Sequence, residues 1–189
     1  MVYPQYAQFE QKSARMLQDL REASFAFADY GDEVQDFRVT GSELRRDTNL
    51  EAETPLAVSG VRTIKAVELA RMMGSAVRPL VIDVIEDDGH ETLPGARWIK
   101  GAGLGPREDD VNADIRERLG LVLEGLTNAN KSALIAFFCA DARCWLSLNA
   151  ALRARDLGYT NVHWYRGGIK AWKAARLESL EAVQYGQVR

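Results

Sequence analysis

The two cysteines of this chain, Cys139 and Cys144, stand five positions apart in one short segment. A continuous apolar run over residues 133–138 ends at Cys139, and a helical pattern resumes a few residues later. Backbone N–H groups and the helix dipole at such a junction favour negative charge, so they stabilise a thiolate and lower its pKa. The pattern therefore indicates a reactive thiol at Cys139. The alternative is a small apolar residue that ends a core strand, because free cysteine is often buried.

Cys144 lies close to the expected start of the following helix. Two cysteines are too few for a disulfide framework, which favours reactivity over covalent stabilisation. Three roles are open to Cys144: a second thiol that resolves a sulfur adduct on Cys139, the nucleophile itself, or a core residue of the helix face. In the reduced protein we expect Cys139 to react with alkylating reagents faster than Cys144, because it lies among the N–H groups of the loop.

The residues around the two thiols set the charge and shape of the candidate site. Asp141 opposes thiolate formation if it approaches Cys139, whereas Arg143 supports it, and either is alternatively a solvated loop charge. Trp145 closes one wall of a pocket or packs in the core beneath the loop. Besides the cysteines, the expected active-site loop consists of Ala140, Asp141, Ala142, Arg143 and Trp145.

Composition limits the class of protein. The chain has 189 residues, of which 47% are hydrophobic and 27% charged, as is ordinary for one globular domain with an extension. A net charge of −3 without a basic stripe argues against nucleic acid as a partner. No apolar stretch is long enough to span a membrane. The N-terminus lacks the layout of a secretory signal, so we expect a cytoplasmic protein, with a periplasmic one as the alternative if the chain is a trimmed mature form.

Alternating strand and helix patterns begin at about residue 58 and predict an α/β sandwich with a mainly parallel sheet. Ahead of them, residues 5–28 form an expected amphipathic helix that packs on the domain or binds a partner protein. Residues 29–57 have the composition of an irregular linker. We therefore expect an N-terminal extension over residues 1–57 and a domain over residues 58–189.

Local signals place the elements of this domain. Thr63 is expected to cap a helix, Gly158 to end one, and Gly167 with Gly168 to turn the chain into the last helix. Cys139 then falls beyond the carboxyl end of a parallel strand, where ligands bind in such folds. Strands are expected over residues 58–63, 80–85, 96–100, 133–138 and 162–165, and helices over residues 64–73, 115–126, 147–157 and 169–175.

The order and spacing of several short motifs resemble the rhodanese (sulfurtransferase) family over roughly residues 58–178. The resemblance implies a rhodanese-like three-layer sandwich, and it puts Cys139 where the family carries its persulfide-forming cysteine. Asp83 matches the aspartate that ends the family's second strand, where it supports the loop by hydrogen bonding. The motifs are Leu80-Val-Ile-Asp83-Val84, Gly89-His90, Leu93-Pro-Gly-Ala96, the cysteine after the strand, Leu157-Gly-Tyr-Thr-Asn-Val162 and Gly167-Gly-Ile-Lys-Ala-Trp172.

Residues 145–151 and 161–165 are similar to those of small rhodanese-like proteins with a Cys…Cys-Trp loop, described beside PQQ-dependent catabolism. Such proteins are usually exported, which is a further reason for the periplasmic alternative. The loop is about two residues longer than in most of the family. Ser147 therefore takes the place of the serine that supports the loop, Leu146 takes the place of its arginine, and Arg143 remains the only loop arginine. Thiosulfate is a dianion that needs clustered positive charge, so we expect a persulfide donor to be preferred.

The resemblance implies that Cys139 takes sulfane sulfur from a small donor, a persulfide or thiosulfate, and passes it to a thiol or cyanide without a cofactor. Two alternatives are a dithiol/disulfide redox protein that uses Cys139 and Cys144, and a catalytically silent rhodanese-like binding module. A cysteine phosphatase is excluded, because it requires arginine at the position of Trp145. His90, His163 and the cysteines lack the close spacing of zinc ligands, so no metal is expected.

Overall fold

The computed structural model describes residues 4–188 and has a six-stranded, all-parallel sheet at its centre, in the order β1-β6-β5-β2-β4-β8. A two-stranded antiparallel ladder, β3-β7, lies outside this sheet. Two of the expected strands, β2 and β5, are neighbours in the interior of the sheet. The strands are β1 (Arg62–Ile64), β2 (Leu80–Asp83), β3 (Glu91–Thr92), β4 (Arg97–Lys100), β5 (Ile135–Phe138), β6 (Val162–Tyr165), β7 (Leu180–Glu181) and β8 (Gln184–Gln187).

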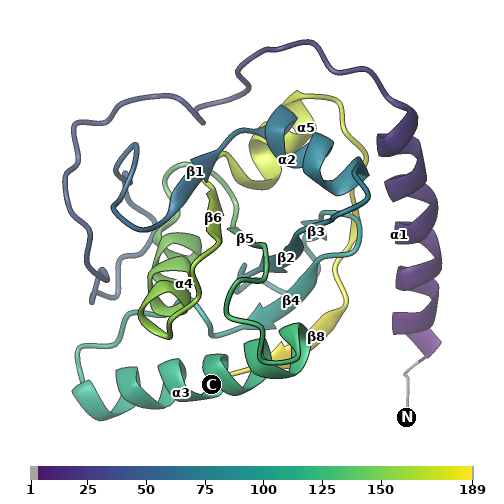
Figure 1. The fold of residues 1–189 in the computed structure, drawn as a ribbon. Helices are drawn as coiled ribbons and strands as arrows, with labels where there is room; N and C mark the ends of the chain where they lie inside the picture. The colour runs from purple at the N-terminus through teal and green to yellow at the C-terminus, as the bar shows by residue number, and fades with distance from the viewer. Residues whose placement is uncertain (1–3, 189) are drawn as a thin grey trace.

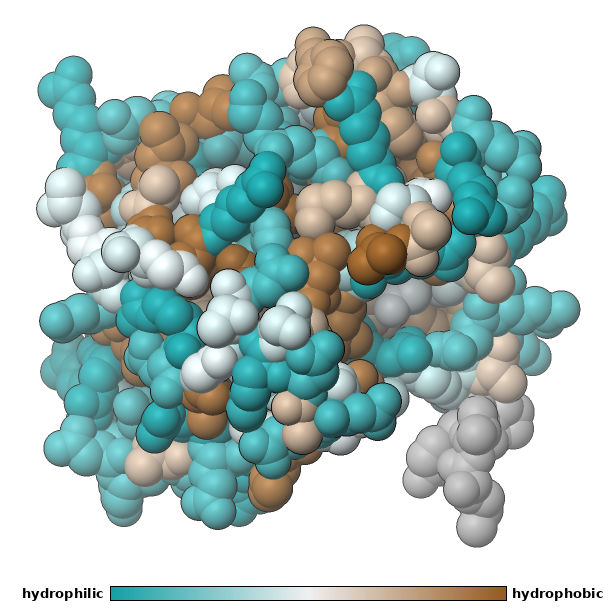
Figure 2. All heavy atoms as spheres, in the orientation of Figure 1, coloured by the Kyte–Doolittle hydropathy of each residue, from teal (hydrophilic) through white to brown (hydrophobic). Residues whose placement is uncertain are grey.

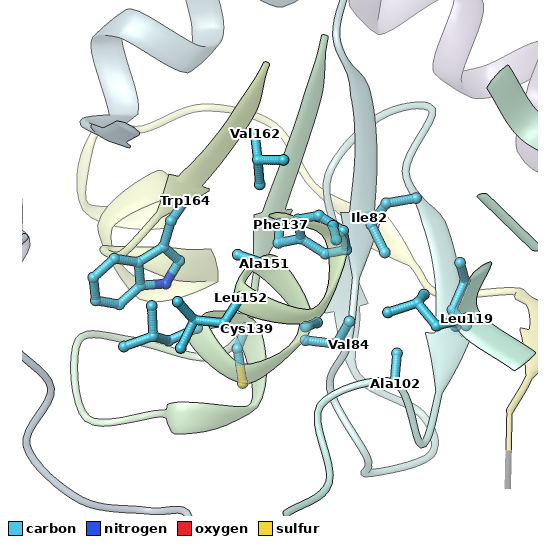
Figure 3. Close-up of a cluster of buried hydrophobic side chains, with 14 of the residues drawn as sticks. Ile82, Val84, Ala102, Leu119, Phe137, Cys139, Ala151, Leu152, Val162 and Trp164 are labelled. Carbon is cyan, nitrogen blue, oxygen red and sulfur yellow. The ribbon is translucent and has the colours of Figure 1, made fainter. Parts of the chain in front are cut away.

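Helices cover both faces of the sheet, which confirms the three-layer α/β architecture (Figure 1). Side chains of β5 alternate between the two layers, because neighbouring residues of a strand point to opposite faces. Ile135 and Phe137 pack with α3 and α4, as Figure 3 shows for part of that cluster, and Ala136 and Phe138 pack with α2 and α5. The helices are α1 (Pro4–Glu22), α2 (Ala66–Gly74), α3 (Asp109–Thr127), α4 (Trp145–Asp156) and α5 (Gly168–Ala174).

The first helix ends at Glu22, so the prediction that it continues to residue 28 is wrong. Beyond Glu22 the chain is not helical, and Arg71 on α2 contacts this segment. The Arg71 guanidinium donates to the Phe25 carbonyl at 2.7 Å and lies 3.9 Å from the ring centroid of the exposed Phe27. Contacts with α2 therefore replace the last helical turn that the apolar spacing predicts.

The remaining part of α1 packs on the domain. Leu20 is buried in the cluster that includes α2 and α5. Gly74 at the end of α2 makes this approach possible, because a Cβ there would come within 2.8 Å of the Leu20 carbonyl oxygen. This close contact matches the packing role considered for the helix.

The second helix begins at Ala66, and Thr63 lies in β1 instead of capping it. Two carboxylates satisfy the first N–H groups of α2 instead. Glu33 accepts from the Ala66 N–H at 2.8 Å, and Glu68 accepts from the Lys65 N–H at 2.9 Å. Because Glu33 belongs to the N-terminal extension, this cap depends on tertiary structure.

The C-terminal residues add a sheet strand that the sequence patterns do not predict. β8 pairs parallel with β4 at the edge of the sheet, although Gln184–Gln187 is largely polar. The following Val188 is fully buried and donates its N–H to the Lys100 carbonyl at 2.9 Å. Backbone pairing, the buried Val188 and the contacts of Tyr185 with Tyr6 and Arg97 therefore hold this edge strand in place.

The surface view in Figure 2 shows small groups of apolar side chains dispersed among hydrophilic ones. Over residues 4–188, no helix has the length and apolar character needed to cross a membrane.

Candidate functional site

The loop that contains both cysteines joins β5 to α4 at the carboxyl end of the sheet. Cys139 follows Phe138 directly, and Cys144 is the N-cap residue of α4. The two residues form a disulfide, with their Cα atoms 6.3 Å apart. Figure 3 shows the Cys139 sulfur beyond the strand and close to α4. Each sulfur is therefore within bonding reach of the other, as a resolving role for one of them requires.

Backbone contacts with α5 hold the first half of the loop. The N–H groups of Ile169 and Lys170 donate to the carbonyl oxygens of Cys139 and Ala140, both at 3.0 Å. Gly168 makes this approach possible, because its φ is +60° and an added Cβ would overlap the Cys139 carbonyl oxygen. The Gly167-Gly168 pair therefore positions the loop as well as turning the chain.

Asp141 shapes the second half of the loop. Its carboxylate accepts from the Arg143 N–H at 2.8 Å, and its carbonyl accepts from the Cys144 N–H at 3.2 Å. Such a turn, closed by the side chain of an aspartate, is a frequent loop conformation. Asp141 therefore belongs to the loop structure, in addition to carrying a charge.

Residues 50–54 of the N-terminal extension lie over the loop, and we call this segment the strap. Leu50 and Glu53 accept hydrogen bonds from the Trp145 backbone N–H and indole N–H at 2.8 and 3.0 Å. The Thr54 hydroxyl donates to the Ala142 carbonyl at 2.6 Å, and Glu51 pairs with Cys144 in an antiparallel bridge. Beneath these contacts Cys139 and Cys144 are only 2% and 6% exposed.

A buried arginine anchors the extension next to the strap. Arg166 follows β6 directly, is 1% exposed, and makes five hydrogen bonds. Four go to carbonyl groups and the fifth goes to the Thr54 hydroxyl, which in turn donates to the loop. Burial lowers the pKa of Arg166. The four carbonyl groups belong to Asp32, Glu33, Gln35 and Thr54.

Two cations beside the loop are paired with carboxylates. One oxygen of Asp32 lies 3.2 Å from both Arg143 Nη1 and Lys170 Nζ. Glu53 lies 4.0 Å from Arg143 Nη2, and Asp141 lies 3.6 Å from Lys170 Nζ. The hydrogen bond that Lys170 donates to Asp32 raises the pKa of Lys170, which therefore stays charged. The positive charge at this loop is consequently offset by the surrounding carboxylates.

Residues 65–175 match the family model of the rhodanese-like domain. The matched segment is more than half of the chain. The chain belongs to the rhodanese-like domain family. A search of curated proteins found no match.

Membership confirms the family resemblance and places the chain among sulfurtransferase-type domains in general. The narrower resemblance to the Cys…Cys-Trp group stays a prediction. The matched residues of this rhodanese-like domain include the whole cysteine loop and both loop cations. By contrast, Asp32 and the strap lie outside the match and are features of the N-terminal extension.

Asp83, which was predicted to support the cysteine loop, makes its side-chain hydrogen bonds to residues 85–92. Asp83 is fully buried, and one oxygen accepts from the Ile85 N–H at 2.9 Å. Its other oxygen bonds Thr92 Oγ1 at 2.5 Å and His90 Nε2 at 2.8 Å. Burial alone would lower the pKa of His90, but its hydrogen bond to Asp83 and the charge of that group outweigh this and raise it. These contacts order residues 85–92, while Asp83 adjoins the loop through its register partner Phe138.

Ser147 and Trp145 fix the beginning of α4. The buried Ser147 hydroxyl accepts from the Trp164 indole at 3.0 Å, which ties α4 to β6. Trp145 is 6% exposed and packs in the core cluster with the cysteines. It therefore takes the core position considered for it and also anchors the strap.

Four residues of the site were not predicted from the sequence: Asp32, Thr54, Arg166 and Lys170. Arg166 had one local signal, since it is a charged residue directly after an apolar strand and therefore at the carboxyl edge of the sheet. Asp32 and Thr54 had none, because they lie in a polar segment that only tertiary packing brings to the loop.

Proposed function

We propose that this protein carries sulfane sulfur as a persulfide on Cys139 and that Cys144 resolves this persulfide. The supporting observation is the bond between the two cysteines across a loop of a rhodanese-like domain, at the carboxyl edge of its parallel sheet. The substrates in this proposal are a small sulfur donor and a thiol acceptor.

The first step loads the sulfur. The Cys139 thiolate attacks the outer sulfur of a donor R–S–S⁻, and a new sulfur–sulfur bond forms on Cys139. The bond between the two donor sulfurs breaks, and the thiolate RS⁻ leaves. With thiosulfate as the donor, sulfite is the leaving group.

Two routes then remove the sulfur. In the transfer route, an acceptor thiolate attacks the outer sulfur, leaves as a persulfide and restores the Cys139 thiolate. In the resolving route, the Cys144 thiolate attacks Cys139 Sγ, a disulfide forms and hydrosulfide leaves. The two cysteines are oxidised and the sulfane sulfur is reduced, so an external thiol must reduce the disulfide before the next cycle.

The position of Cys144 suits a resolving thiol. As N-cap residue of the 12-residue helix α4, it lies at the positive end of the helix dipole, which favours its thiolate. Cys139 directly follows β5, and the family resemblance implies that this is the position of the persulfide-forming cysteine.

The silent binding module is the second candidate, and the burial of both thiols beneath the strap favours it. A donor reaches Cys139 only when the structure around the loop opens, because the residue is 2% exposed. A module that never opens would keep its disulfide and bind no sulfur.

Intact mass spectrometry distinguishes the candidates. Reduced wild type, Cys139→Ser and Cys144→Ser are incubated with cysteine persulfide or thiosulfate. We expect one added sulfur atom on Cys144→Ser and none on Cys139→Ser, with hydrosulfide release and disulfide formation in the wild type. A stable sulfur adduct on Cys139→Ser would show that Cys144 is the nucleophile.

Brief alkylation of the reduced wild type is a parallel measurement, and faster labelling at Cys139 is the expected result. Disulfide formation in the wild type without loading of either variant would support a dithiol redox protein. An absence of both reactions would support the binding module.

A further inference from the structure

Asp32 is a buried carboxylate that the N-terminal extension brings to the cysteine loop. It is 8% exposed, whereas the side chains of its two cationic partners, Arg143 and Lys170, are 44% and 53% exposed. The backbone carbonyl of Asp32 is itself held by Arg166 at 3.1 Å. The contact with the buried Arg166 therefore fixes the position of the Asp32 charge.

The hydrogen bonding of Asp32 is one-sided. Oδ2 lies 3.2 Å from both cations, while Oδ1 is buried and has no hydrogen-bond partner within residues 4–188. Burying a carboxylate oxygen without a partner costs free energy. The contacts that offset this cost are those of Oδ2, so the charge of Asp32 is directed at Arg143 and Lys170.

We propose that Asp32 selects the sulfur donor by neutralising Arg143 and Lys170, so that the loop accepts a low-charge persulfide and disfavours the thiosulfate dianion. This inference rests on the proposed function of Cys139 and adds the donor class to it. Asp32 acts through the two cations and is therefore a positioning residue.

The preference for a persulfide over thiosulfate follows from the charges at the loop. Arg143 and Lys170 are the cations that form ion pairs at this loop within the described residues, and Asp32 contacts both. Arginine and lysine side chains bind a sulfonate-like oxyanion when their donors are free. With the carboxylate in place, a dianion meets an added repulsion, and a donor with a single negative charge meets about half of it.

The test measures persulfide loading of reduced Cys144→Ser carrying Asp32→Asn. For a separation of about 8 Å between the removed unit charge and the dianion, loading from thiosulfate should accelerate about fourfold at low ionic strength and about twofold near physiological salt. Loading from cysteine persulfide should change by about twofold or less. A purely structural role for Asp32 would produce neither the difference between donors nor the dependence on salt.

Asp36→Asn is the matched control, because Asp36 is an exposed carboxylate of the same segment whose hydrogen bond goes to the Arg38 N–H. Glu53→Gln is a second variant at an exposed site 4.0 Å from Arg143, and it should accelerate thiosulfate loading by a smaller factor. This variant decides the question if Asp32→Asn does not fold.

Equal rates in Asp32→Asn and its parent, or an equal gain in Asp36→Asn, would overturn donor selection while leaving the persulfide on Cys139 intact. Failure of the parent to load from either donor would overturn the proposed function, and donor selection with it.

Discussion

Replacing Arg166 by methionine removes the five hydrogen bonds that this residue donates to the N-terminal extension. Four carbonyl groups and the Thr54 hydroxyl lose their donor, and methionine fills most of the volume without replacing it. Each net hydrogen bond of this kind contributes about 1 kcal/mol, and a buried group left without a partner costs about 1–3 kcal/mol.

The cost of burying the guanidinium is also removed, which offsets part of the loss. That cost is visible in the pKa of Arg166, which burial lowers. We therefore expect the free energy of unfolding to fall by about 3–5 kcal/mol in Arg166→Met. Arg166→Lys should lose less, because its ammonium group keeps the charge and three of the donors.

Urea unfolding monitored by tryptophan fluorescence measures this loss. A second assay follows reduction of the Cys139–Cys144 disulfide by dithiothreitol. Because Arg166 holds the strap through Thr54, its loss should expose the disulfide and accelerate reduction by about tenfold or more. Arg15→Met is the control, since Arg15 is exposed on α1.

Two results would refute this reasoning. One is a free energy of unfolding of Arg166→Met within about 1 kcal/mol of wild type, which would show that water satisfies the carbonyl groups instead. The other is a reduction rate equal to that of Arg15→Met. In that case the strap would open independently of its anchor.

Two further predictions concern the Asp83–His90 pair and the contact of Gly168 with the cysteine loop. Because the folded-state pKa of His90 is raised above 6.5, its pairing with Asp83 stabilises the fold fully below that value and is lost as pH rises through the raised pKa. Urea unfolding across this pH range should show that dependence in wild type and a weaker one in His90→Asn, and equal slopes would count against it. Gly168→Ala should reduce the free energy of unfolding by about 2 kcal/mol or more, because of the positive φ and the overlap with Cys139. By contrast, Gly125→Ala, in open space on α3, should increase it by about 0.5–1 kcal/mol, and a similar loss in both variants would contradict the overlap.

The central strands were predictable because their signal is local and strong. The apolar run that ends at Cys139 becomes a strand buried on both faces, and the first four residues of the expected strand 80–85 become its neighbour. By contrast, Gln184–Gln187 joins the sheet through backbone pairing, for which its side chains carry little signal.

At the end of the first helix, by contrast, the sequence pattern predicts structure that does not form. Its apolar spacing continues to Phe27, but Arg71 binds the chain in a non-helical conformation there. A pattern of apolar residues predicts which face of a helix is buried. It does not predict that a hydrogen-bond donor on another element will end the helix.

The sequence by itself determined the parallel α/β framework and the placement of Cys139 at its carboxyl edge, because hydrophobic periodicity and turn residues act over a few positions. Tertiary structure alone decided that Asp32, Thr54 and Arg166 meet at this loop. Their contacts with the loop or with one another span 88 to 134 positions of the chain. Hydrogen bonds and ion pairs depend on the distance and direction between groups in space. A polar segment without periodicity gives no sequence pattern from which these contacts can be predicted.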